Sequence, residues 1–269
     1  MPALSLAHIG FFDLTPPELV VCAAAAGFDA VNFTLNPSRP GAPQFPIRGD
    51  TAMAREARAA LADTGLILSD VTSIPLRPES DPAAHEPLFA AAQFLGARSF
   101  VAVGQDPDHA RLTDTYARLC EIAAPYGLTI DLEFMLYSQV RTIEEGLAIV
   151  RGSGQPNARL LIDCLHFSRA GSDPALIGQA ERGLLAQMQL CDAPVASPED
   201  LPGEARGGRL PPGMGGLDLA AIMAQLPRDL DVSVEVPMGG ELAALPALER
   251  ATLLHDASRG FLRSVGWGQ

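Results

Sequence analysis

Residues 129–134 read TIDLEF, and polar and apolar side chains alternate along this stretch. A period of two is typical of a β-strand that has one face in an apolar core and the other face against polar groups. The same pattern recurs in residues 160–164 (LLIDC), 187–190 (QMQL) and 232–236 (VSVEV). We therefore predict four equivalent strands, each with one polar face.

The rest of the chain continues the alternation of strand and helix patterns. We predict strands at residues 4–9, 28–35, 66–73, 98–103, 129–134, 159–164, 185–191 and 231–236. We predict helix starts at Thr15, Asp50, Asp81, Asp106, Thr142 and Asp173, and further helices at residues 217–226 and 245–262. Eight strands that each feed a helix predict a (β/α)8 barrel or a doubly wound sheet, and the count of eight favours the barrel.

The composition indicates a single domain with an acidic surface. The chain has 269 residues, 48% of them hydrophobic, and no linker-like shift interrupts the pattern, so we expect one TIM-barrel domain over residues 1–269. Its net charge of −13 would repel phosphate groups, which argues against nucleic acid or an anionic membrane surface as a partner. The apolar run at residues 20–26 is too short to span a bilayer.

The first ten residues lack a basic segment followed by a long apolar run, so we expect no secretory signal. The four cysteines are scattered through apolar patterns without a CxxC spacing, which predicts reduced core thiols and a cytoplasmic protein. These cysteines are Cys22, Cys120, Cys164 and Cys191.

Four oxygen-bearing side chains lie at the ends of consecutive predicted strands. They are Glu133, Asp163, Gln189 and Glu235, separated by 30, 26 and 46 residues, about one strand–helix unit each. In a barrel the apolar positions pack under helices and the polar positions face the interior, where carboxylates need a partner charge. We predict that the four side chains bind one divalent cation. The alternative is that each carboxylate caps a helix or pairs with an arginine at the rim. An all-oxygen set suits Mn²⁺ or Mg²⁺, and Co²⁺ is a further alternative.

Residues 192–216 form a long connection without periodicity, which we expect at the carboxyl ends of the strands, where active sites of barrels lie. Its Arg206 and Arg209 are candidates to bind a substrate phosphate or carboxylate, and solvated loop charges are the alternative. His166 follows Asp163 by three residues and must lie in the next turn to act as a general base or substrate contact. His8 is a further candidate substrate contact, if the first strand turns it to the barrel mouth.

Several short motifs occur in a characteristic order: DLEF at 131–134, LIDCLH at 161–166, QLCDA at 189–193, PGMG at 212–215 and VEVP at 234–237. With PEL at 17–19 and AAGFD at 25–29, this order resembles the xylose isomerase-like TIM-barrel family of sugar (phosphate) isomerases and epimerases. The resemblance implies metal ligands at Glu133, Asp163 and Glu235, but Gln189 stands where most members have histidine. A glutamine there, together with His166, is similar to the 3-dehydroshikimate dehydratases of the superfamily.

Three functions follow from these residues. The first is a metal-dependent isomerase or epimerase of a small sugar, polyol or sugar phosphate, in which Glu133 and Glu235 act as base and acid and the metal stabilises an enediolate. The second is a lyase of the 3-dehydroshikimate dehydratase type, in which the enolate expels a β-hydroxyl. The third is a non-catalytic ligand-binding barrel. The glutamine at a position where most members have a metal-binding histidine supports this hypothesis. All three imply a small-molecule partner and are compatible with a homo-oligomer.

Overall fold

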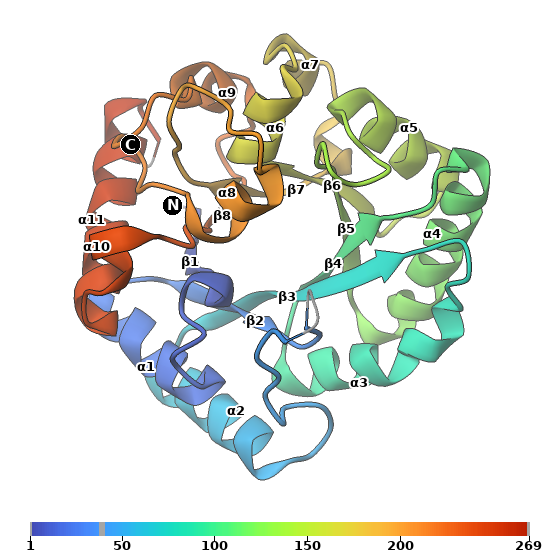
Figure 1. Ribbon diagram of the computed structural model, residues 1–269. Helices are drawn as coiled ribbons and strands as arrows, with labels where there is room; N and C mark the ends of the chain where they lie inside the picture. Colours follow the sequence, from blue (N-terminus) through green and yellow to red (C-terminus); the bar gives the residue numbers. More distant parts are fainter. Residues whose placement is uncertain (1, 38–40, 268–269) are drawn as a thin grey trace.

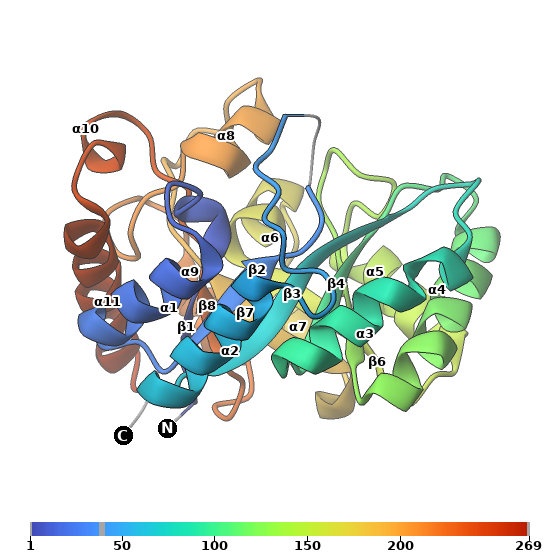
Figure 2. The same cartoon turned by 90° about the horizontal axis from the view of Figure 1, so that it is seen from below.

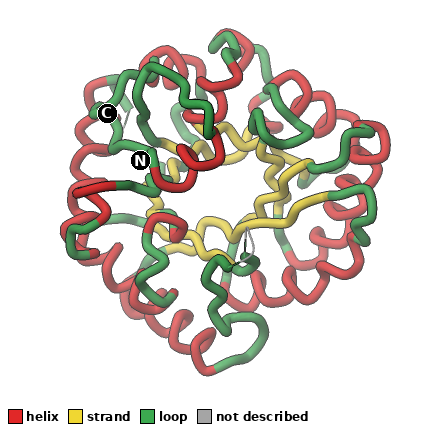
Figure 3. Tube along the Cα trace, in the orientation of Figure 1, coloured by secondary structure: helices red, strands yellow, loops and turns green. Residues whose placement is uncertain are grey.

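The computed structural model describes residues 2–37 and 41–267, and eight parallel strands close into a barrel within it (Figures 1 and 3). The strands pair in sequence order, and β8 pairs with β1 to complete the ring. Their bounds are β1 (Leu4–Leu6), β2 (Ala30–Thr34), β3 (Ile67–Leu76), β4 (Ser99–Gly104), β5 (Thr129–Glu133), β6 (Ala158–Asp163), β7 (Leu185–Leu190) and β8 (Val232–Val234). The predicted fold, a (β/α)8 barrel, is confirmed.

Helices surround the barrel and cover its outer face (Figure 1). They are α1 (Pro16–Ala26), α2 (Ala52–Thr64), α3 (Glu86–Leu95), α4 (His109–Ala123), α5 (Ile143–Ser153), α6 (Cys164–Ala170), α7 (Ala175–Gly178), α8 (Leu201–Gly207), α9 (Leu219–Gln225), α10 (Gly240–Ala243) and α11 (Ala247–Ser264). Short 3₁₀ turns lie at His8–Gly10, Pro82–His85, Ala124–Tyr126 and Arg182–Leu184. None of the described helices is long and apolar enough to cross a membrane.

Local capping chemistry sets the helix starts, and it corrects two of the predicted ones. Thr15 and Glu18 form the predicted capping box of α1. The predicted start at Asp50 was wrong, because Thr51 caps α2 by accepting a hydrogen bond from the amide of Ala54. Asp106 was also wrong as a helix start, since Asp108 caps α4. In both cases the helix begins where a side chain reaches the first-turn amides, one or two residues after the predicted aspartate.

The connection after β6 departs from the sequence prediction in a way that shapes the functional site. Helix α6, which the sequence did not predict, begins at Cys164 directly after the strand. The helix predicted to begin at Asp173 follows it as the short α7, and the Ala175 amide donates to the Asp173 carboxylate. Asp163 ends β6 and caps α6 through its own carboxylate, which accepts from the amide of His166 over 2.9 Å. His166 therefore lies in the first turn of a helix at the barrel mouth.

The alternating strand pattern divides the molecule into an apolar outer layer and a polar interior. Ile130 and Leu132 are fully buried in the layer between strands and helices. Asp131 and Glu133, from the same strand, are only 2% and 8% exposed and belong to the polar face of the strand. Glu133 is the last residue of β5 and lines the cavity at the carboxyl ends of the strands, whereas Asp131 lines a separate hollow with Ser99 and Thr129. The strand pattern thus positions Glu133 in the site.

The long connection from Asp192 onward is ordered and includes α8. An antiparallel bridge joins Asp192 to Leu210, and the carboxylate of Asp192 accepts from the amides of Gly213, Gly215 and Leu217. Helix α8 stands at the end of the barrel opposite the two chain termini (Figure 2). The connection thus covers part of the barrel mouth, as the sequence predicted.

Candidate active site

A cavity of about 710 Å³ opens at the carboxyl ends of the strands. Its wall combines polar and apolar side chains from most of the barrel. The polar and charged side chains that line it include Asn32, Thr34, Thr72, Arg77, Gln105, Glu133, Tyr137, His166, Gln189, Arg206, Arg209 and Glu235. Three of the four predicted metal ligands are among them, and Asp163 lies directly beside Gln189 in the paired strands β6 and β7.

Gln189 and Glu235 are joined across neighbouring strands. The Nε2 atom of Gln189 donates to Oε2 of Glu235 over 2.8 Å. The other amide atom of Gln189, Oε1, is buried and has no hydrogen-bond partner in the described part of the protein. A buried carbonyl oxygen without a partner is costly, so this atom would gain from a bound cation or donor.

Arg209 enters the same cluster and is only 2% exposed. Its Nη1 lies 2.5 Å from Oδ2 of Asp163, and its Nη2 lies 3.1 Å from Oε1 of Glu235. The Nε atom donates to the carbonyl of Ala205 at 3.0 Å, which ties the guanidinium to α8. The alternative considered from the sequence, carboxylates paired with an arginine, therefore holds for Asp163 and Glu235 but not for Glu133.

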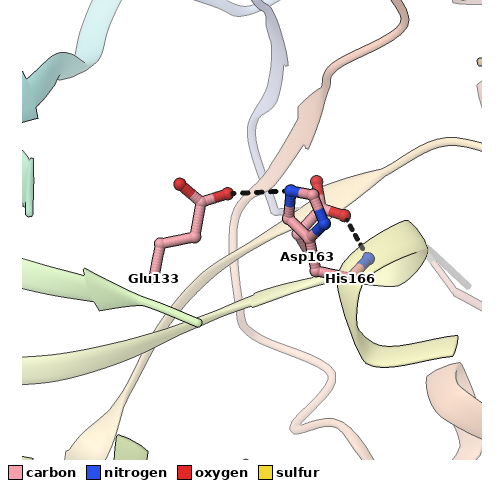
Figure 4. A group of neighbouring side chains, drawn as sticks. All are labelled: Glu133, Asp163 and His166. Carbon is pink, nitrogen blue, oxygen red and sulfur yellow. Dashed lines mark hydrogen bonds and ion pairs between the residues drawn. The ribbon is translucent and has the colours of Figure 1, made fainter. Parts of the chain in front are cut away.

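Glu133 and His166 face each other at the other side of the cluster (Figure 4). Oε1 of Glu133 lies 3.8 Å from Nε2 of His166, and ligand atoms of these two residues and Asp163 all lie within 4.8 Å of one another. The hydroxyl of Tyr137 lies 3.5 Å from the same Nε2 atom. This nitrogen is thus shared between a carboxylate and a phenol at the cavity wall.

Burial and mutual repulsion shift the pKa values of this cluster. Burial, and then the charges of Glu235 and Asp163, raise the pKa of Glu133 well above its usual range. Burial raises the pKa of Glu235 to about 7, against the opposing charge of Arg209. Burial would also raise the pKa of Asp163, but the charges and hydrogen bonds of Arg209 and His166 together lower it. Burial lowers the pKa of His166 to about 4, so this imidazole is neutral near pH 7.

The donor set fits a divalent cation. Three buried carboxylates face one guanidinium, so the fully ionised cluster carries two negative charges in excess. The raised pKa of Glu133 and the unpartnered Oε1 of Gln189 are the expected signs of a missing positive charge. Oxygen donors at a largely buried centre suit Mn²⁺, Mg²⁺ or Co²⁺. The imidazole of His166 is a further donor within reach of Glu133 and Asp163.

The three predicted substrate contacts differ in placement. Arg206 is exposed on α8 and lines the cavity, whereas Arg209 lines it from a buried position. His8 is not among the lining residues: its ring stacks on Phe45, and its Nε2 donates to the carbonyl of Leu14 at 3.0 Å. Burial lowers the pKa of His8 to about 4, as expected for a neutral core histidine.

The cavity residues that the sequence analysis missed include Arg77 and Tyr137. Arg77 follows the end of β3, which runs to Leu76 instead of the predicted Ser73, and Tyr137 follows the end of β5. Their position directly after a strand was the one available signal, because loops at the carboxyl ends of barrel strands carry functional side chains. Without periodicity in these loops, the sequence did not distinguish them from solvated residues.

A buried ion pair fixes α8 above the cavity. Arg169 of α6 contacts Glu204 of α8 through two hydrogen bonds of 2.6 and 2.9 Å, and it also donates to the carbonyl of Pro194 at 2.7 Å. The two side chains are 7% and 5% exposed. Helix α6 carries His166, and α8 leads into Arg209, so this pair links two walls of the site.

The sequence of this chain is similar to those of known proteins. The sequence profile of the family described as "Xylose isomerase-like TIM barrel" matches residues 21–264. A 3-dehydroshikimate dehydratase of Pseudomonas aeruginosa is 31% identical over 226 residues, which are 78% of this chain and 34% of that protein. The chain thus spans about a third of the length of this relative. An inosose isomerase of Bacillus subtilis is 32% identical over 117 residues, 42% of this chain and 40% of that protein.

Solved structures share the fold. The IolI protein, determined with a zinc atom bound, superposes with a TM-score of 0.78 at 21% identity and covers 98% of this chain and 99% of its own. A D-allulose 3-epimerase from Methylomonas sp. superposes with a TM-score of 0.70 at 17% identity, with 97% and 98% of the two chains covered. At these identities the likeness concerns the fold alone.

Proposed function

The chain belongs to the xylose isomerase-like TIM-barrel family, and from this premise we propose that it is a divalent-metal-dependent enzyme. In this proposal it removes the proton next to the ketone of a small polyhydroxylated substrate. The relatives named above are enzymes with dehydratase, isomerase and epimerase activities, and all three can begin with this step. Glu133, Asp163, Gln189 and Glu235 are the proposed metal ligands, with Mn²⁺ or Mg²⁺ as the favoured ion and Co²⁺ as an alternative.

The observation that carries the proposal is the contact of Glu133 with a neutral His166 beside a cluster of excess negative charge. A neutral imidazole in a cavity wall can accept a proton from a carbon acid, provided that the resulting negative charge is stabilised. A bound divalent cation would supply this stabilisation as a Lewis acid at the substrate oxygens. His166 is therefore the proposed base, and the nearby Glu133 carboxylate would balance the imidazolium charge.

Dehydration is the outcome that the arrangement favours. Glu235, which follows β8, is held by both Gln189 and Arg209. The groups that are free to accept a proton are therefore Glu133 and His166, which lie on one side of the barrel mouth. Loss of a proton and a β-hydroxyl from the same face needs acid–base groups on one side only. Epimerisation at a carbon needs groups on both faces, and Glu235 would first have to leave its two partners. We therefore favour a lyase of the 3-dehydroshikimate dehydratase type over an isomerase or epimerase.

The rim of the cavity supports an anionic substrate. Arg77 and Arg206 line the cavity, and neither forms an ion pair within the described residues. In a protein with a net charge of −13, two uncompensated arginines at one opening would attract a carboxylate or phosphate. A cyclic hydroxy-keto acid such as 3-dehydroshikimate carries such a carboxylate. The isomerase remains the second candidate because of the similarity to inosose isomerase.

The test uses protein freed of metal and then loaded with Mn²⁺. With 3-dehydroshikimate we expect an increasing near-ultraviolet absorbance from 3,4-dihydroxybenzoate, and no increase with His166→Gln. An inosose, assayed for rearranged ketone, tests the second candidate. If neither substrate reacts and neither takes up deuterium from D₂O, the proposal of an enzyme of this class is wrong and a non-catalytic barrel is favoured.

A further inference from the structure

Tyr137 is a cavity residue that the proposed function does not yet use. It lies in the connection between β5 and α5, lines the cavity, and places its ring at right angles to His166, with ring centroids 5.5 Å apart and planes at 79°. Its hydroxyl is 3.5 Å from Nε2 of His166, the atom that also faces Glu133 at 3.8 Å. The proposed base therefore has a phenol on one side and a carboxylate on the other.

The loop that carries Tyr137 is held firmly by its own backbone. The amide of Met135 donates to the carbonyl of Val140 at 2.9 Å, and the hydroxyl of Ser138, which is 4% exposed, donates to the same carbonyl at 2.6 Å. The amide of Gln139 donates to the carbonyl of Gly104 on β4 at 3.0 Å. Tyr137 is thus presented by a closed turn that is tied to the barrel.

We propose that Tyr137 is a catalytic residue that protonates the leaving hydroxyl. This inference rests on the proposed dehydration. Nε2 of His166 takes the proton as the C–H bond next to the ketone breaks, and the electron pair of that bond enters the enolate. When the β C–O bond breaks, the enolate electron pair forms the new C=C bond and restores the ketone, while the C–O electron pair stays on the oxygen, which takes the phenolic proton and departs as water. The phenolate then regains a proton from the His166 imidazolium, so one water leaves and both side chains return to their starting state.

Other donors in the cavity are less suited to this role. The guanidinium of Arg209 is held by Asp163 and Glu235, and the hydroxyls of Thr34 and Thr72 pair with each other at 3.3 Å. Burial, and then the charge of Glu133, raise the pKa of the Tyr137 phenol, so it keeps its proton until the leaving oxygen takes it. A phenol nevertheless gives up a proton more readily than an aliphatic hydroxyl. The Tyr137 hydroxyl lines the cavity and lies 3.5 Å from Nε2 of the base His166, and this contact provides the route by which the proton returns.

The experiment measures two steps separately in Tyr137→Phe protein loaded with Mn²⁺. Product release reports the complete dehydration, and deuterium uptake into recovered 3-dehydroshikimate in D₂O, read by mass spectrometry, reports proton removal alone. We expect product release to fall about 100-fold, a typical loss for one acid catalyst, while deuterium uptake stays within about threefold of wild type. Tyr126→Phe is the matched control, because the Tyr126 hydroxyl bonds Glu86 at an exposed position, and it should change neither rate.

Each other outcome overturns the inference in a distinguishable way. Wild-type product release by Tyr137→Phe would exclude a role as acid while leaving the proposed dehydration intact. A parallel loss of product release and deuterium uptake would show that Tyr137 only supports His166. If the wild-type protein neither exchanges nor dehydrates the substrate, the proposed function itself fails and the role of Tyr137 with it. Equal metal content and equal unfolding midpoints exclude a folding defect in the variant.

Discussion

Nη1 of Arg209 lies 2.5 Å from Oδ2 of Asp163, and the two side chains are 2% and 0% exposed. The second guanidinium nitrogen reaches Glu235 at 3.1 Å. A buried carboxylate of this kind cannot stay ionised without a positive partner. Arg209 therefore acts as a built-in countercharge, and it leaves one carboxylate, Glu133, and one amide oxygen, on Gln189, without such a partner.

The first prediction concerns this ion pair. Arg209→Met should lower the free energy of unfolding of the metal-free protein by about 3–5 kcal/mol, because two buried carboxylates lose their partner. Arg206→Met is the control: this side chain is exposed, and its loss should change stability by no more than about 0.5 kcal/mol. Urea denaturation in the presence of a chelator measures both. Equal midpoints for the two variants would contradict the role given to Arg209.

The second prediction concerns Gln189 as a ligand. Gln189→Ala removes the unpartnered Oε1 and should weaken Mn²⁺ binding at least about 10-fold. Gln189→His replaces an amide oxygen by an imidazole and should shift the preference of the site toward Zn²⁺. Calorimetric titration with each metal measures both effects. Unchanged Mn²⁺ affinity in Gln189→Ala would remove this residue from the ligand set.

The third prediction concerns the rim of the cavity. Arg77→Gln should raise KM about 5–10-fold with little change in kcat, because an exposed ion pair with a substrate carboxylate contributes about 1 kcal/mol to binding. Arg118→Gln, which removes an exposed arginine paired with Glu121 on α4, should leave both constants unchanged. Steady-state kinetics at two salt concentrations checks the assignment. A fall in kcat at constant KM would place Arg77 in the chemical step instead.

The fourth prediction follows from the core position of His8. Its pKa is lowered from 6.5 to about 4 in the folded protein, mainly by burial, so the unfolded chain binds a proton more readily. The stabilisation from a neutral His8 is complete above pH 6.5 and is lost as the pH falls toward about 4. His8→Gln should therefore show a shallower loss of stability between pH 6.5 and 4.5 than wild type. Parallel pH profiles would show that His8 titrates normally.

The sequence predicted the fold and the convergence of the four oxygen donors for the same physical reason. The alternation in residues 129–134 assigns each side chain to one face, and parallel strands of a closed barrel bring their ends together. Glu133, Gln189 and Glu235 line one cavity, and Asp163 is paired in register with Gln189.

The remaining parts of the site depend on contacts that no local pattern encodes. The pairing of Arg209 with Asp163 depends on how residues 192–216 fold back over the barrel, which the bridge from Asp192 to Leu210 determines. His8 turned away from the cavity because a 3₁₀ turn follows β1 directly, and aromatic rings then enclose the imidazole. Tyr137 was missed because a single tyrosine in a loop carries no periodic signal.

The central claim is that Glu133, Asp163, Gln189 and Glu235 hold one divalent cation, and anomalous diffraction from crystals soaked in Mn²⁺ tests it most directly. We expect one strong peak per chain, within bonding distance of an oxygen from each of the four side chains. A map without a peak, in which Arg209 still bridges Asp163 and Glu235 beside a protonated Glu133, would contradict the claim, and the proposed chemistry would fail with it.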